Sequence, residues 1–182
     1  MKTFDFSKRN LEQAREATRP VYRRDYVRSR PRKSAQKLTV LGQGVIDYDL
    51  KKYQYDDEIK NIAGRIKEEN KGAHLIVFVT PLSKHLFCHI VKEGCLPAYE
   101  RWLGDLVDSF GEVYNFLYIN SVTAEDANFA DIGHFYPEAG TLIARRITGE
   151  EGQREDFGVL VTRSNLKEHL KFIRENSKAC TN

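Results

Sequence analysis

The sequence has no long apolar stretch, and this absence limits where the protein can reside. Among its 182 residues, no window approaches the 18 consecutive apolar residues that indicate a transmembrane helix. The N-terminus, from Met1 to Arg9, also lacks the apolar core of a secretory signal peptide. As the chain stands, these two absences predict a cytoplasmic protein without a membrane-spanning segment.

Cysteine is scarce. The three cysteines, Cys88, Cys95 and Cys180, are odd in number and match no zinc-binding spacing. A disulfide framework is therefore not expected, and we interpret the cysteines as buried thiols. Because Cys88 and Cys95 are seven residues apart, they could also lie on one helix face. The sequence predicts no metal site and no cofactor.

Charge is nearly balanced over the whole chain but unevenly placed. The net charge is +3, yet residues 1–37 hold 12 Lys and Arg against 4 Asp and Glu. We interpret residues 1–37 as a basic leader and linker with a short helix over 8–18. Such a basic segment could contact an anionic surface or nucleic acid, but no binding motif accompanies the charge. A solvated leader is the favoured interpretation, and nucleic acid is not a favoured partner.

Residues 38–178 alternate between helical and strand patterns. A short strand or loop is expected at 38–45, where two glycines indicate a turn. Nearly continuous apolar runs at 73–80 and 113–119 and a short run at 157–161 predict strands. Apolar residues at helical spacing predict helices that open at 56–58 and stop at 70–72, that extend over about 83–94, 97–110 and 137–147, and that start near 164. This order predicts a three-layer α/β/α domain with a mostly parallel sheet.

Two of the expected loops follow buried strands and carry histidine. Asp131 and His134 are three residues apart, in a loop that turns at Gly133 and enters a helix at Pro137. A carboxylate so close can hold an imidazole in one tautomer and leave its other nitrogen free as a base. His85 follows the first buried strand and could line the same pocket and bind substrate. His85 and His89 have a spacing that can hold a metal ion, but no third ligand is evident, so surface histidines are favoured.

The stretch Asn-Phe-Ala-Asp-Ile-Gly-His-Phe-Tyr-Pro-Glu-Ala-Gly at 128–140 resembles the last sequence block of SGNH/GDSL hydrolases. The similarity extends over roughly residues 50–175. The resemblance implies a flavodoxin-like α/β/α fold, in which Asp131 and His134 would complete a Ser–His–Asp triad. The related bacterial proteins are mostly envelope-associated and are distantly similar to proteins that acylate cell-surface polymers, so the resemblance implies a place in the cell envelope if an N-terminal segment has been lost.

The chain departs from the family at its first block, a strand that ends in Gly-x-Ser and carries the nucleophile. Ser7, Ser29 and Ser34 lie in charged surroundings, and no Gly-x-Asn supplies the second oxyanion donor. The chain therefore resembles an SGNH domain that lacks its first β–α unit. An Asp–His pair without a nucleophile and an oxyanion hole loses most acyl-transfer catalysis.

Two functions follow as hypotheses. The first is ester hydrolysis or acyl transfer on a carbohydrate or lipid ester, in which Asp131 orients His134 toward a serine from an upstream segment. The second is a non-catalytic binding domain. The incomplete sheet would leave an exposed edge, which favours self-association or another partner.

Overall fold

The computed structural model describes residue 50 and residues 53–150 and 154–181. The basic leader expected at 1–37 and the strand or loop expected at 38–45 lie outside the described residues. In chain order, the elements are α4 (Ile59–Glu69), β1 (Phe78–Val79), α5 (Lys84–Lys92), α6 (Leu96–Phe110), β2 (Glu112–Asn115), the 3₁₀ turn η3 (Asp126–Asn128), α7 (Pro137–Thr148), β3 (Val159–Thr162), α8 (Leu166–Ser177) and the 3₁₀ turn η4 (Lys178–Cys180).

The sheet is small and mixed. Its strand order is β1-β2-β3, with β1 parallel to β2 and β3 antiparallel to β2. The prediction of alternating helices and strands in an α/β domain is confirmed, but the prediction of a mostly parallel sheet is wrong. The Tyr118 hydroxyl donates to the carbonyl of Asp156 and accepts from the N–H of Gly158. These bonds hold the start of β3 beside the carboxyl end of β2, so β3 can only run back along β2.

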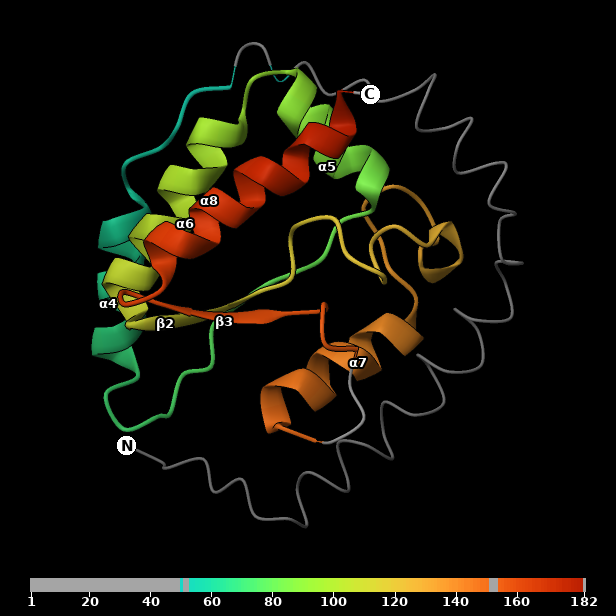
Figure 1. Ribbon diagram of the computed structural model, residues 1–182. Coiled ribbons are helices and arrows are strands. Elements are labelled where there is room, and N and C mark those ends of the chain that lie inside the picture. The colour runs from blue at the N-terminus through green and yellow to red at the C-terminus, as the bar shows by residue number, and fades with distance from the viewer. Residues whose placement is uncertain (1–49, 51–52, 151–153, 182) are drawn as a thin grey trace. The chain divides into compact units, whose positions relative to one another are not determined.

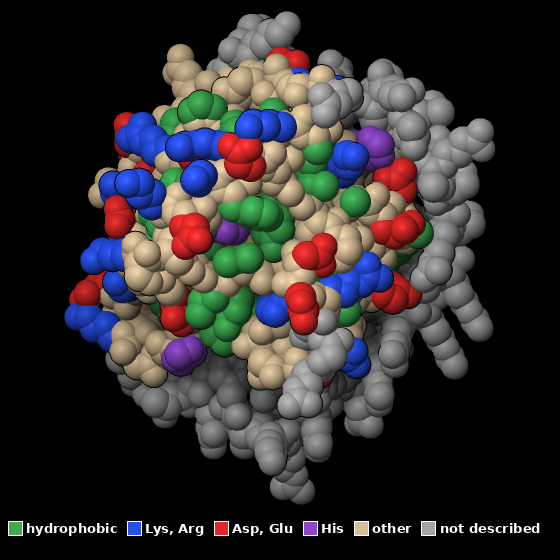
Figure 2. Space-filling view, in the orientation of Figure 1, with side chains coloured by type: hydrophobic (Ala, Val, Ile, Leu, Met, Phe, Trp, Pro, Cys, Tyr) green, Lys and Arg blue, Asp and Glu red, His purple; other side chains and the backbone are tan. Residues whose placement is uncertain are grey.

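Helices lie on both sides of this sheet. Figure 1 shows α6 and α8 together on one side and α7 on the other. The larger apolar cluster lies on the α6 side, and its fully buried side chains include Leu103, Val113 and Ile173. The smaller cluster lies under α7, where Phe116 and Phe157 pack with ring centroids 4.8 Å apart. On the face shown in Figure 2, charges of both signs are interspersed around limited apolar areas.

One glycine is required by this packing. Gly158 has a φ of +84°, and a Cβ at this position would overlap the ring of Phe116. A side chain here would be strained by the backbone conformation and would also collide with the core. The smaller cluster therefore depends on the missing side chain.

A disulfide corrects the interpretation of the cysteines. Cys88 on α5 and Cys180 in η4 are bonded to each other; their Cα atoms are 5.0 Å apart, and the two residues are 92 positions apart in sequence. Both are buried, as expected, but they are not thiols. Cys95 keeps its thiol and precedes α6, so it does not share a helix with Cys88. The pairing depends on α8 packing across α6, which places η4 against α5.

No helix in the described part of the chain is both long enough and apolar enough to span a membrane.

Candidate functional site

The Asp131–His134 loop is closed at its base by backbone pairing. It lies between η3 and α7, and Phe129 and Phe135 form an isolated antiparallel bridge across it. The N–H of Ala130 donates to the carbonyl of His134 at 2.7 Å, and the N–H of Tyr136 donates to Asn128 at 2.8 Å. Phe129 is fully buried, so the loop is anchored in the protein interior. Its tip is therefore a defined turn rather than an open connection.

Asp131 accepts three hydrogen bonds at this tip. Its Oδ1 lies 2.9 Å from the backbone N of Gly133, 2.9 Å from the backbone N of His134 and 2.8 Å from Nδ1 of His134. Burial by itself raises the pKa of Asp131, but the hydrogen bonds from Gly133 and His134 outweigh it and bring the pKa below its usual 3.8. Asp131 is therefore ionised at neutral pH and fixed in one orientation.

His134 has the geometry expected from the sequence, with one ring nitrogen held by Asp131 and the other free of hydrogen bonds to described residues. Because its Nδ1 faces the Asp131 carboxylate, Nδ1 carries the proton and Nε2 has a lone pair in the neutral ring. No described residue hydrogen-bonds to Nε2, and the side chain is 75% exposed. The predicted pairing of Asp131 and His134 is confirmed, and the arrangement can accept a proton at Nε2. Their catalytic role stays a prediction.

Ser83 connects this loop to helix α5. Its backbone N–H and its Oγ both donate to the carbonyl of Ile132, at 3.2 and 2.7 Å. The same Oγ accepts from the N–H of Leu86 and caps α5. Ser83 is fully buried, so its hydroxyl supports the loop and is not placed to attack a substrate. A serine before a helical pattern indicates a cap, but its bond to Ile132 has no signal in the sequence.

His85 lies in the first turn of α5 and does not hydrogen-bond to Asp131 or His134. Its Nε2 is 3.0 Å from Oδ1 of Asp126 in η3, and both side chains are largely buried. The structure thus contains a second Asp–His pair in the segment that precedes the Asp131–His134 loop. The substrate-binding role predicted for His85 stays a prediction. No cluster of three or more His, Cys, Asp or Glu that could hold a metal ion occurs among the described residues.

Ser7, Ser29 and Ser34 lie outside the described residues. Three asparagines near the strand ends, Asn115, Asn120 and Asn128, use their amides within the fold: Asn120 donates to the carbonyl of Tyr118, and Asn128 donates to the carbonyl of Val122. Asn115 donates to Nε2 of His169 at 2.8 Å. None of these three amides is therefore available as it stands to stabilise an oxyanion.

His169 belongs to a buried polar network that the sequence did not indicate. Tyr99 donates to the carbonyl of Leu117 and accepts from the amide of Asn115, which also donates to His169. Burial lowers the pKa of His169 to about 4, so the ring is neutral at pH 7. This network joins α6, β2 and α8 and serves the fold rather than chemistry.

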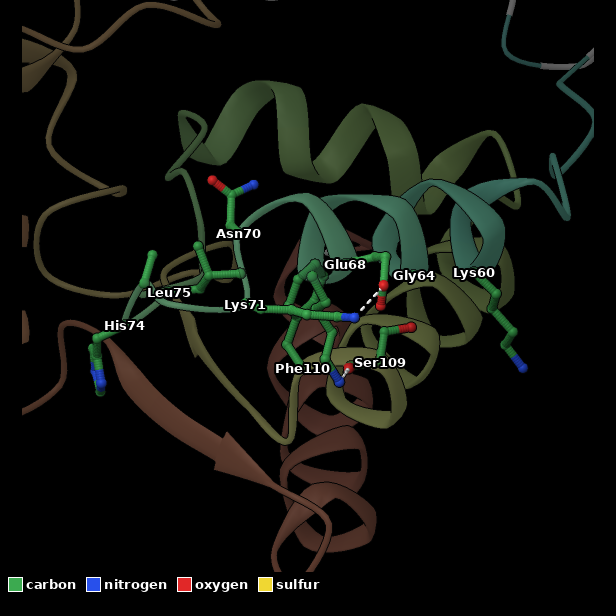
Figure 3. A pocket seen from close by; sticks show the side chains of 11 residues that line it. Lys60, Gly64, Glu68, Asn70, Lys71, His74, Leu75, Ser109 and Phe110 are labelled. Atoms are coloured by element: carbon green, nitrogen blue, oxygen red, sulfur yellow. Dashed lines mark hydrogen bonds and ion pairs between the residues drawn. The ribbon is translucent and has the colours of Figure 1, made fainter. Parts of the chain in front are cut away.

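A large hollow lined by described residues lies elsewhere. It has a volume of about 680 Å³ and lies between α4, the turn after it and the end of α6 (Figure 3). Its cations have partners: Lys67 donates to the carbonyl of Ser109, and Lys71 pairs with Glu68. Asp131, His134 and His85 line neither this hollow nor two smaller ones, which lie between α4 and β1 and beside Tyr99 and Trp102.

Comparison of the chain with protein-family models, with curated proteins and with solved structures gives no match. The similarity to SGNH hydrolases therefore stays an inference from the sequence.

Proposed function

We propose that the chain carries the Asp–His half of an SGNH-type site for ester hydrolysis or acyl transfer on a carbohydrate or lipid ester. The observation that supports this most is the Asp131–His134 pair. Its carboxylate is fixed by backbone N–H groups, and the second ring nitrogen is exposed. The layers of helices on both sides of a sheet are compatible with the three-layer fold of that family.

In this proposal, His134 is the general base. Nε2 would take the proton from a serine hydroxyl as the oxygen attacks the ester carbonyl, and the ring would return that proton to the leaving alkoxide. Asp131 stabilises the imidazolium between these two transfers and does not itself take the proton. The serine and the oxyanion donors would come from outside the described residues, from a segment that packs beside the loop.

The disulfide supports a location in the cell envelope over the cytoplasm. Disulfides persist in oxidising compartments and are rare where glutathione and thioredoxin keep thiols reduced. Cys88 and Cys180 are both buried and bonded, which fits a protein that folds outside the reducing cytoplasm. We therefore propose an envelope location, as the family resemblance implies.

The test is hydrolysis of p-nitrophenyl acetate by this chain joined to the upstream segment that supplies the serine, together with labelling by a fluorophosphonate that reacts with activated serines. Loss of a general base lowers the rate by about 10²–10⁴-fold, so His134→Ala should reduce turnover by that factor and abolish labelling. His74→Ala is the matched control, because His74 lies in the turn after α4 and should leave the rate unchanged. No activity in the protein that includes the serine segment, or a rate there that His134→Ala does not change, would refute the proposal.

A second function is favoured by a specific observation. Apart from Asp131, no described residue hydrogen-bonds to the ring of His134, and no described hydroxyl or thiol does so. This is the arrangement expected of a domain that binds a ligand or partner without reacting with it. Absence of fluorophosphonate labelling even in the protein that includes the upstream serine segment would support this binding function.

A further inference from the structure

The first turn of α5 is attached to the segment that carries the Asp131–His134 loop. The carbonyl of Ile132, at the tip of the loop, accepts from both the backbone N–H and the Oγ of Ser83. The carbonyl of Thr123, which precedes the loop, accepts from the backbone N–H of Lys84 at 2.8 Å. Two neighbouring residues of α5 therefore hold the segment on either side of η3.

The next two residues of α5 contact the same segment through their side chains. Nε2 of His85 lies 3.0 Å from Oδ1 of Asp126 in η3. Because a carboxylate can only accept, Nε2 carries the proton in this bond. Leu86 lies beside Gly133, since a Cβ on that glycine would be 3.7 Å from Cδ2 of Leu86. The start of α5 thus contacts the segment at four consecutive residues.

Asp126 connects His85 to the base of the loop. Its backbone carbonyl accepts from the N–H of Phe129 at 3.1 Å, and Phe129 forms with Phe135 the bridge that closes the loop. The side chain of Asp126 is only 14% exposed, and that of His85 is 27% exposed. A largely buried carboxylate that loses a hydrogen-bond donor is destabilised. Loss of the imidazole should therefore displace η3 and, with it, the bridge.

The exposed ring of His134 depends on this support, because the tip of the loop has few attachments of its own. Asp131, which holds the ring, belongs to the same tip. Among the described residues, Ser83 is the only one outside the loop that hydrogen-bonds to residues 130–134. The direction of Nε2 is therefore set by the backbone of the loop, which the first turn of α5 and η3 hold in place.

We propose that His85 is a positioning residue for His134, which acts through Asp126 and the base of the loop and not by binding substrate. Proton transfer requires the two groups to be within hydrogen-bond reach, and a misplacement of about 1 Å can lower a rate about 10²-fold. The catalytic importance of His85 rests on the function proposed above. Its effect on the ring of His134 does not depend on that function.

The test is the tautomer of His134, read from the ring ¹⁵N chemical shifts of the full chain at about pH 9, where an unperturbed ring is neutral. In the wild type, Asp131 should keep the proton on Nδ1. His85→Ala should lose this preference and shift the ring toward the Nε2–H form that a free histidine side chain favours. His85→Gln should restore it, because its amide can also donate to Asp126. His134→Gln identifies the signals.

Lys92→Ala is the matched control, because Lys92 is exposed in the last turn of the same helix, and it should keep the wild-type tautomer. Circular dichroism checks folding, and His85→Phe, which also lacks a donor, replaces the alanine variant if that does not fold. The tautomer can be measured whether or not the chain hydrolyses esters, so failure of the proposed activity is a separate result. A wild type without the Nδ1–H preference overturns the proposal. So does a preference that persists in His85→Ala, or that His85→Gln or Lys92→Ala also loses.

Discussion

Three histidines occupy three different environments, and only the partner of His134 was predicted from the sequence. His134 is held by Asp131 within a short turn, so its partner could be found from local spacing alone. His85 binds Asp126, 41 residues away, and His169 binds Asn115, 54 residues away. Spacing along the chain carries no information about such partners, because packing of separate elements brings them together.

The buried ring of His169 predicts a pH dependence of stability. Its pKa is about 4 in the folded protein, against 6.5 for an exposed ring, so the unfolded chain binds the extra proton first. Stability should therefore fall as the pH drops from 6.5 to 4. His169→Gln should show a shallower decline, because Gln can accept from Asn115 without taking a proton. Thermal unfolding of the wild type and of His169→Gln at each pH measures the two declines. Parallel curves of stability against pH for the two proteins would contradict the prediction.

Gly158 predicts a large effect from one methyl group. Gly158→Ala forces a strained backbone conformation and an overlap with Phe116, so we expect a loss of about 2–4 kcal/mol in the free energy of unfolding. Gly149 also has a positive φ, of +71°, but no atom lies within 4 Å of a Cβ there. Gly149→Ala should therefore cost only about 1–2 kcal/mol. Urea titration compares them, and equal losses would rule out the contact with Phe116 as a cause.

At the scale of secondary structure, amphipathic periodicity predicted the helices well. The helix expected to open at 56–58 and to stop at 70–72 contains α4 with a few residues to spare at each end, and the one at 137–147 matches α7 to within a residue. The strands were predicted less well. The run at 73–80 forms a ladder only at Phe78 and Val79, and β3 runs antiparallel. Apolar content marks a buried extended segment, but the length of a ladder and its direction depend on the neighbouring strand.

Helix α5 and the Asp131–His134 loop are coupled through one serine. Ser83→Ala removes the cap of α5 and the hydroxyl bond to Ile132, so we expect a loss of about 1–2 kcal/mol in stability. The loop should also exchange its amide hydrogens faster at Gly133 and His134. Ser164→Ala, at an exposed hydroxyl, is the control and should change neither. Hydrogen exchange followed by mass spectrometry measures the loop, and unchanged exchange in Ser83→Ala would show that the loop does not depend on α5.

At the scale of the whole molecule, the disulfide is the clearest difference from the sequence-based interpretation. An odd number of cysteines argued against bonding, and nothing near Cys88 in sequence indicates Cys180 as its partner. The pair forms because α8 crosses α6 and ends beside α5. The α/β character could be predicted from local patterns, whereas this long-range contact could not.

Reduction of this bond predicts a loss of global stability. A disulfide that closes a long loop contributes about 2–4 kcal/mol, chiefly by restricting the unfolded chain. Dithiothreitol should therefore lower the melting temperature of the wild type. Cys95→Ser should melt like the wild type with and without reductant, because Cys95 is not bonded. The melting temperature of the double variant, with both Cys88→Ala and Cys180→Ala, should not change with reductant. If the melting temperature of the wild type does not change either, the disulfide does not stabilise the fold.

The position of that bond also decides what a protease can release. A single cut at any peptide bond between Cys88 and Cys180 leaves two pieces joined through sulfur, and the ring so opened contains β2, α7, β3 and the Asp131–His134 turn. A cut before Cys88 has no such tether. Helix α4 and strand β1 are therefore the part of the described chain that proteolysis could detach, and Asp131 and His134 would stay with the covalently closed remainder.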